Sequence, residues 1–205
     1  MSMLYVFAGP NGAGKSTLSS SLVPEGTPIF DGDKEFALLK RSFANTDSAT
    51  LFDAVNGHIF EDWKAKQLKT NAVCAFETNF RSAQVMDSVT QFKQNDYETR
   101  LLFFGLDSVE AAIQRVAIRV SLGGHNVSLE NIKANYKEGL KNLGAYYKAF
   151  DQVEIWQNFR YDEPTMTAQP LLKIEKGSIT EKLEELPTWL TSTLGGHSKR
   201  KGLGL

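Results

Sequence analysis

The chain has 205 residues, with 23 basic and 24 acidic side chains and a net charge of −1. Hydrophobic residues make up 41% and charged residues 23%, as in ordinary globular domains, so a chain that is disordered or fibrous over its full length is excluded. The balanced charge gives no reason to expect nucleic-acid binding. A single cysteine, Cys74, excludes an internal disulfide and a cysteine-based zinc site. Neither a secretory signal nor an apolar run of roughly twenty residues is present, so we expect a cytoplasmic protein without membrane contact.

Strand-like and helix-like segments alternate along the sequence. Short apolar runs predict strands over residues 4–8, 28–30, 72–76, 101–104, 153–156 and 171–175. Helical spacing of apolar residues predicts helices from the glycine-rich turn to before Pro24, and over 33–43, 48–69, 82–92, 107–122, 128–143 and 180–194. For the last helix, an interruption at Pro187 is the alternative. This alternation predicts one α/β domain, a parallel sheet covered by helices on both faces.

The domain is expected to cover residues 1–194. Residues 195–205 are rich in glycine and basic side chains and show no periodicity, so we expect a disordered basic tail. A contact of residues 199–201 with nucleic acid or membrane is the less favoured alternative.

Residues 9–16 match the phosphate-loop pattern G-x-x-x-x-G-K-[ST] at every required position, between a predicted strand and a predicted helix. Glycines let the main chain approach an anion closely, and the helix N-terminus adds partial positive charge. Lys15 is expected to reach the β- and γ-phosphates, and Ser16 to offer its hydroxyl to Mg²⁺. The alternative is a glycine-rich turn that binds no ligand and only links strand and helix. We therefore expect a nucleoside triphosphate to be bound by Gly9, Pro10, Asn11, Gly12, Ala13, Gly14, Lys15, Ser16 and Thr17.

Two large classes of phosphate-loop protein can be excluded. The loop has the wording of ABC-transporter ATPases, but residues 121–125 lack the final Gln of an LSGGQ-type signature. The apolar run that ends in Asp107 is broken by a glycine and is not followed by Glu. A GTPase would need an Asn-Lys-x-Asp element, which is also absent. Small-molecule kinases remain.

Acidic residues follow the second predicted strand. Asp31 and Asp33 are expected beside the phosphate loop, because the carboxyl ends of parallel strands form one edge of the sheet. A carboxylate there can accept the proton of an attacking hydroxyl or help to hold Mg²⁺. The alternative is that Asp33 only caps the following helix, and the two roles are compatible.

Further charged residues suggest a lid and an acceptor pocket. Arg115 and Arg119 are four residues apart with no acidic residue at helical spacing, so they are candidates to meet a phosphate. The alternative is a solvated basic face or an ion pair with a residue distant in the sequence. The glycines at 123–124 would let this segment close as a lid. Glu77 follows the third strand and could bind sugar hydroxyls, hold Mg²⁺ through water, or cap a helix.

With these residues together, the chain resembles the zeta-toxin family of P-loop kinases in its short-chain form. The resemblance spans residues 4 to about 160 and combines two elements, the phosphate loop and a Gly-Gly-His-x-Val lid, that are more specific together than alone. The matching segments are residues 7–17, Asp33, the Phe-Glu-Thr-Asn element at 76–79, and the lid at 115–127.

The resemblance implies phosphoryl transfer from ATP, with Mg²⁺, to a hydroxyl of a small acceptor. In well-studied members the acceptor is UDP-N-acetylglucosamine and a small antitoxin protein restrains the kinase. Lys15 would have the family's phosphate-loop lysine role, Asp33 that of the base, and Arg115 or Arg119 that of the charge-stabilising arginine. The residues implied for the acceptor side are Glu77, Asn79, Arg81 and His125.

Several positions depart from the family pattern. Asn79 stands where Thr is common, and Asn135 stands where the family has an arginine. The lost charge would have to be supplied by His125, Lys133 or Arg119. These departures keep a second hypothesis open, an ATP-dependent binding or switch protein with slow hydrolysis and a protein partner. A third, a polynucleotide kinase, rests only on the basic tail.

Overall fold

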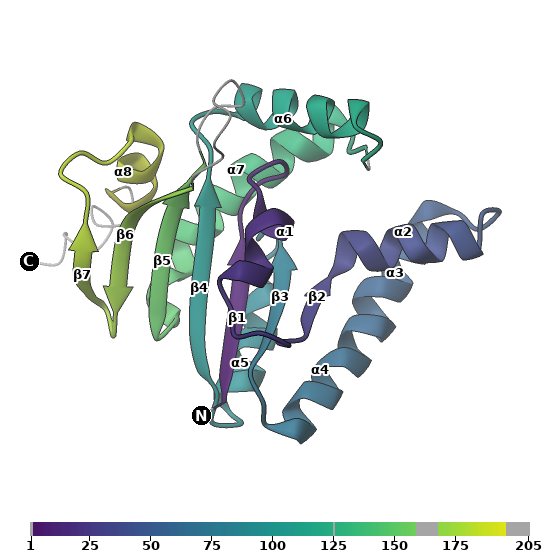
Figure 1. Cartoon of the computed structure of the whole chain (residues 1–205), viewed down its shortest axis with the longest axis horizontal. Helices are drawn as coiled ribbons and strands as arrows, with labels where there is room; N and C mark the ends of the chain where they lie inside the picture. The colour runs from purple at the N-terminus through teal and green to yellow at the C-terminus, as the bar shows by residue number, and fades with distance from the viewer. Residues whose placement is uncertain (1, 125, 159–167, 196–205) are drawn as a thin grey trace, which may run out of the picture.

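The structure is a computed structural model that describes residues 2–124, 126–158 and 168–195. In these residues seven strands form one sheet in the order β2-β3-β1-β4-β5-β6-β7 (Figure 1). The first five strands of that order are parallel, and β6 and β7 are antiparallel additions at one edge. The strands are β1 (Met3–Ala8), β2 (Ile29–Asp31), β3 (Cys74–Thr78), β4 (Glu98–Gly105), β5 (Gln152–Gln157), β6 (Gln169–Glu175) and β7 (Ser178–Lys182).

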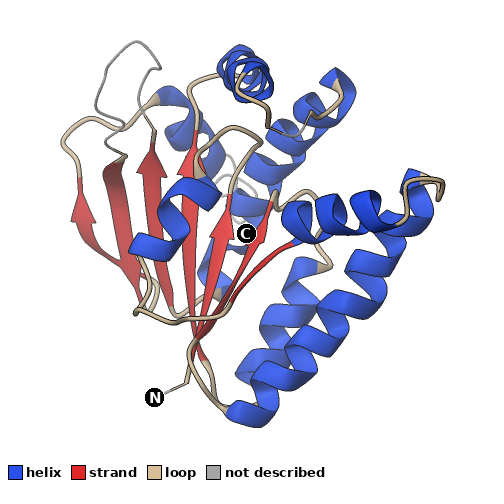
Figure 2. Cartoon of the chain, turned by 45° about the vertical axis from the view of Figure 1, so that its right-hand side comes forward, coloured by secondary structure: helices blue, strands red, loops and turns tan. Residues whose placement is uncertain are grey.

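Helices lie on both sides of this sheet (Figure 2). The α-helices are α1 (Lys15–Leu18), α2 (Gly32–Ser42), α3 (Ser48–Ala54), α4 (Phe60–Thr70), α5 (Val85–Lys93), α6 (Val109–Ser121), α7 (Leu129–Tyr146) and α8 (Thr188–Gly195). Short 3₁₀ turns η1 (Ser19–Ser21) and η3 (Tyr147–Ala149) extend α1 and α7, and a π-helical turn η2 (Val55–Ile59) joins α3 to α4. The predicted α/β fold, a mostly parallel sheet with helices on both faces, is confirmed.

The sheet carries an apolar core on each face, and the alternation of side chains along β1 shows why. Leu4 and Val6 point to one core, and Tyr5 and Phe7 point to the other. The first core also contains side chains of α2, η2, α4, α5, α7 and α8, and the second contains side chains of α1, α6 and α7. Because β1 and β4 are buried on both faces, they read in the sequence as continuous apolar runs.

The last predicted helix, residues 180–194, is interrupted at Pro187, and its first part is a strand and not a helix. Lys176 and Gly177 have φ values of 49° and 79°, and this tight turn sends the chain back as β7, paired with β6. Helix α8 begins only at Thr188, after Pro187, whose ring fits the start of a helix but not its interior. Among the described helices, none combines the length and apolar character needed to cross a membrane. The predicted tail lies almost wholly outside the described residues.

Candidate active site

The phosphate loop joins β1 to α1 at the edge of the sheet where the parallel strands end (Figure 1). Two of its glycines occupy positions that no other residue would fit. Gly9 has a φ of 137°, and a Cβ there would lie 2.2 Å from the carbonyl oxygen of Phe104. Gly14 has a φ of 90°, and a Cβ there would lie 2.5 Å from the side-chain nitrogen Nδ2 of Asn158. The loop is therefore packed tightly against the ends of β4 and β5.

Lys15 connects this loop to the segment that follows β3. Its Nζ donates to the carbonyl oxygens of Gly9 (2.7 Å) and Pro10 (3.2 Å) and to Oδ1 of Asn79 (3.0 Å). Burial lowers the pKa of Lys15, while the carboxylates of Glu77, Asp33 and Asp31, in decreasing order of effect, favour its charged form. The side chain thus lies where several acidic groups and the loop carbonyls converge.

Glu77 binds two hydroxyls of the first helical turns. Its Oε2 accepts from Oγ of Ser16 (2.5 Å) and its Oε1 accepts from Oγ of Ser19 (2.9 Å). Burial raises the pKa of Glu77 and the nearby Asp31 adds to this, whereas the hydrogen bonds from the two serines oppose it. The parallel register explains the position of Glu77, because it lies opposite Phe7 of β1 and Asp31 of β2. Hydroxyl and carboxylate oxygens are ligands that Mg²⁺ prefers, so this donor set fits a magnesium ion bound with a nucleotide.

Asp31 and Asp33 have different environments. Asp31 is buried and caps α2, since its Oδ1 accepts from the main-chain N–H groups of Asp33 (3.1 Å) and Lys34 (3.2 Å). Asp33 is exposed in the first turn of α2, yet its negative charge raises the pKa of Lys15 more than that of Asp31 does. The alternative that Asp33 caps the helix is therefore wrong, because Asp31 does so.

Helix α6 brings two arginines to the phosphate loop. Nε of Arg115 donates to the carbonyl oxygen of Gly12 (2.6 Å), and the residue is only 6% exposed, so a solvated basic face does not describe it. Arg119 lies one turn further along α6 and its charge lowers the pKa of Lys15. The helix ends at Ser121, and Gly123 follows with a φ of 84°. His125 lies outside the described residues.

The acceptor-side candidates divide into two groups. Glu77 and Asn79 contact the phosphate loop through Ser16 and Lys15. Arg81 is exposed and instead donates from Nη1 to Oδ1 of Asn131 on α7 (2.9 Å). The structure thus brings Glu77 and Asn79 to the loop, while Arg81 faces the start of α7.

Two asparagines that contact the phosphate loop were not predicted from the sequence. Nδ2 of Asn135 donates to Oδ1 of Asn11 (2.7 Å), and Nδ2 of Asn158 donates to the carbonyl oxygen of Ala13 (3.1 Å). Asn158 carries a usable signal, because it directly follows a predicted strand on the ligand side of the sheet. Asn135 carries a weaker one, a polar residue next to the apolar stripe of its helix.

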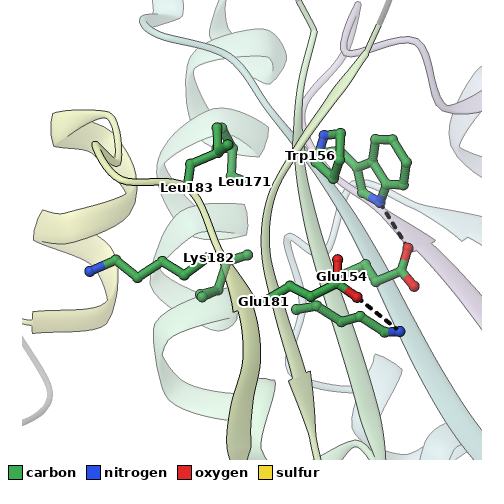
Figure 3. Close-up of a pocket in the computed structure, with 9 residues that line it drawn as sticks. Glu154, Trp156, Leu171, Glu181, Lys182 and Leu183 are labelled. Carbon is green, nitrogen blue, oxygen red and sulfur yellow. Dashed lines mark hydrogen bonds and ion pairs between the residues drawn. The ribbon is translucent and has the colours of Figure 1, made fainter.

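A cavity of about 310 Å³ lies apart from this site, on β5, β6 and β7 (Figure 3). Four of its lining side chains form two pairs: Lys173 with Glu181 (3.6 Å), and Nε1 of Trp156 with Glu154 (3.2 Å). No phosphate-loop residue is among the described residues that line it. The nucleotide chemistry is therefore expected at the phosphate loop and not in this cavity.

Comparison with solved structures shows the same fold elsewhere. A structure of the PezAT chromosomal toxin–antitoxin system of Streptococcus pneumoniae matches with a TM-score of 0.61 and 18% identity, over 98% of this chain and 86% of that one. The AvrRxo1-ORF1:-ORF2 complex matches with a TM-score of 0.69 and 13% identity, over 94% of this chain and 64% of that one. The structure of the same complex with ATP matches with a TM-score of 0.63 and 11% identity, over 100% of this chain and 65% of that one.

A comparison with curated protein sequences found no match. A protein-family model described as an AAA domain matches residues 4–138. That range covers more than half of the chain and contains the phosphate loop, Asp31, Asp33 and Glu77. The chain belongs to the AAA domain family.

Proposed function

We propose that this protein is a Mg²⁺- and ATP-dependent kinase of zeta-toxin type, which transfers the γ-phosphate to a hydroxyl of a small acceptor. The observation that carries the proposal is the pair of contacts across the site, Ser16 to Glu77 and Lys15 to Asn79. They join the expected phosphate-binding loop to side chains at the end of the neighbouring strand β3 and just after it, where an acceptor would have to lie. The fold shared with a structure that holds ATP supports a nucleotide as the donor.

In this proposal residues 9–17 bind the phosphates of ATP, and Lys15 reaches the β- and γ-phosphates. Ser16 would hold Mg²⁺ through its hydroxyl, and Glu77 orients that hydroxyl by accepting a hydrogen bond from it, with 2.5 Å between the two oxygens. When bound, Mg²⁺ supplies positive charge that neutralises the β- and γ-phosphate oxygens. Arg115 and Arg119 supply further positive charge to the transferring group from α6.

Asp33 is proposed as the base that accepts the proton of the attacking hydroxyl. Its exposed side chain can meet an acceptor, whereas Asp31 is buried and holds two main-chain N–H groups. The negative charge of Asp33 also raises the pKa of Lys15, after the larger effects of burial and Glu77, which is consistent with a position near the phosphate loop. A positioned carboxylate of this kind contributes about a hundredfold or more to the rate.

The acceptor is proposed to contact Glu77, Asn79, Arg81 and His125. A nucleotide sugar such as UDP-N-acetylglucosamine suits this set, because it offers hydroxyls to the carboxylate and amide, and phosphates to the cationic side chains. A small antitoxin protein is proposed as partner, and the toxin–antitoxin system among the similar folds supports it. We place the kinase in the cytoplasm, where ATP and such acceptors occur together.

Mass spectrometry of a small-molecule extract tests the proposal directly. The extract, and separately UDP-N-acetylglucosamine, is incubated with the protein, ATP and Mg²⁺, and with Lys15→Ala as the matched control. We expect one compound to gain the mass of one phosphate only with the parent protein. Tight binding of ATP with no phosphorylated product in any sample would contradict the kinase and favour the switch protein.

A further inference from the structure

One face of α7 is polar where the helix meets the candidate active site. Asn131, Asn135, Gly139 and Asn142, here called the asparagine face, are spaced by four, four and three residues and so lie on the same side of the helix. Asn135, Gly139 and Asn142 are all buried. A buried polar stripe on a helix is costly unless each polar group has a partner, so the contacts of this face identify what it holds.

The first contact of the asparagine face is with the phosphate loop. Asn135 donates from Nδ2 to Oδ1 of Asn11 at 2.7 Å, and the two side chains are 6% and 3% exposed. Asn11 is the third residue of the loop, between the two glycines at 9 and 12. Because both side-chain amides are shielded from water, this hydrogen bond fixes the distance between the phosphate loop and α7.

The second contact is with the loop that follows β3. Asn142 donates from Nδ2 to the carbonyl oxygens of Phe80 (2.8 Å) and Arg81 (3.0 Å). Phe80 is fully buried and has a φ of 53°, a left-handed conformation that a bulky residue adopts only when its surroundings impose it. Gly139 lies between the two contacts, and a Cβ there would be 2.8 Å from the carbonyl oxygen of Asn79. The loop after β3 therefore packs directly against the backbone of α7 at Gly139, and the hydrogen bonds from Asn142 hold it one turn further along the helix.

We infer that the asparagine face of α7 fixes the position of the phosphate loop relative to the loop after β3, with Asn135 a positioning residue for the nucleotide and Asn142 one for the acceptor. The two anchoring residues are seven positions apart, which is about 10 Å along a helix. One helix therefore sets the distance between the phosphate loop and the loop after β3. A phosphoryl group that moves from nucleotide to acceptor would have to cross that distance. The part that concerns the acceptor rests on the proposed function.

The nucleotide part is tested with the fluorescent analogue mant-ATP. Asn135→Leu keeps the approximate volume of the side chain and leaves the buried carbonyl of Asn11 without its donor, so we expect an affinity about tenfold weaker. Lys137→Ala, an exposed position on the same helix, is the matched control and should bind as the parent does. An unchanged affinity of folded Asn135→Leu overturns this part.

The acceptor part is tested with Asn142→Leu and Gly139→Ala. Asn142→Leu should bind mant-ATP within about twofold of the parent, because it lies about 10 Å along the helix from Asn135. Gly139→Ala lies about 6 Å from Asn135 and should weaken mant-ATP binding less than Asn135→Leu does. Both should show faster amide hydrogen exchange in residues 79–84 and unchanged exchange in 9–18. Acceptor phosphorylation should fall about tenfold or more, since small misplacements cost large factors in rate.

These measurements separate the inference from the proposed function. A general loss of structure would change exchange in both loops, whereas a positioning role changes it in one. If the parent phosphorylates no acceptor, the proposed function fails, and mant-ATP affinity and exchange still decide the inference. Should Asn142→Leu not fold, Gly139→Ala decides, because alanine favours the helix and only displaces the loop. Parental exchange in residues 79–84 of a folded variant overturns the acceptor part.

Discussion

The division of labour between Asp31 and Asp33 can be tested with three substitutions. Asp31→Ala removes the cap of α2, Asp31→Asn keeps an oxygen that can accept the same two N–H groups, and Asp33→Asn removes the exposed carboxylate alone. If Asp31 is structural and Asp33 is the base, stability and turnover should change in different variants. The three proteins together therefore distinguish a cap from a catalytic acid.

The expected magnitudes follow from the contacts of each side chain. Loss of an N-cap costs about 0.5–2 kcal/mol, so we expect Asp31→Ala to unfold about 1–8 °C below the parent. The ion pair of Asp31 with Lys34 adds little, because the lysine is 69% exposed. Asp31→Asn and Asp33→Asn should each change stability by a few tenths of a kcal/mol, the latter through the helix dipole. Only Asp33→Asn should lose about a hundredfold or more in turnover.

Thermal unfolding followed by circular dichroism measures the first effect, and ATP-dependent phosphorylation of the acceptor measures the second. Turnover is compared at a temperature at which every variant is folded, so that loss of structure does not imitate loss of the base. The assignment is refuted if Asp33→Asn turns over as the parent does while Asp31→Asn is inactive. That result would move the base to the buried aspartate.

Three further substitutions or labels test the packing around the site. Gly9→Ala places a Cβ 2.2 Å from the carbonyl oxygen of Phe104 at a positive φ, so mant-ATP affinity should fall about tenfold or more, and parental affinity would contradict the tight-loop geometry. Gly105→Ala places a Cβ 2.2 Å from the ring of Trp189, and urea unfolding should show a loss of about 1–3 kcal/mol; no loss would mean that α8 does not pack there. Burial raises the pKa of Cys74 to about 12, so at pH 8 the thiolate is scarce and native protein should not react with Ellman's reagent, whereas urea-unfolded protein should. Rapid reaction of the native protein would show that this strand is accessible.

The strands and the phosphate loop could be predicted from the sequence for physical reasons. Strands buried on both faces must be continuously apolar, and β1 and β4 are. A main chain that wraps a phosphate needs glycines at fixed spacing, and the loop has them. Where prediction failed, at β7, the local sequence Thr-Glu-Lys-Leu-Glu-Glu-Leu at 180–186 is rich in helix formers. Pairing with β6 across a tight turn outweighs that propensity.

The candidate site was predictable to the extent that strand ends define it. Asp31 and Glu77 could be placed near the phosphate loop because parallel strands bring their carboxyl ends to one edge, and the structure pairs these two residues in register. The contacts of Asn135 with Asn11 and of Asn158 with Ala13 join residues 124 and 145 positions apart. No local pattern encodes such contacts, because they depend on how α7 and β5 pack in three dimensions.

The charges around Lys15 explain why carboxylates can surround an expected phosphate site. Lys15, Arg115 and Arg119 supply three positive charges, whereas Asp31, Asp33 and Glu77 all raise the pKa of Lys15 by their negative charge. Carboxylates near a bound triphosphate would repel it unless cations or hydrogen-bond donors offset their negative charge. Asp31 is committed to the α2 cap and Glu77 to the serine hydroxyls, where a divalent cation is favoured. That leaves Asp33 as the exposed acid of the three, which is why we propose it, and not Asp31 or Glu77, as the base.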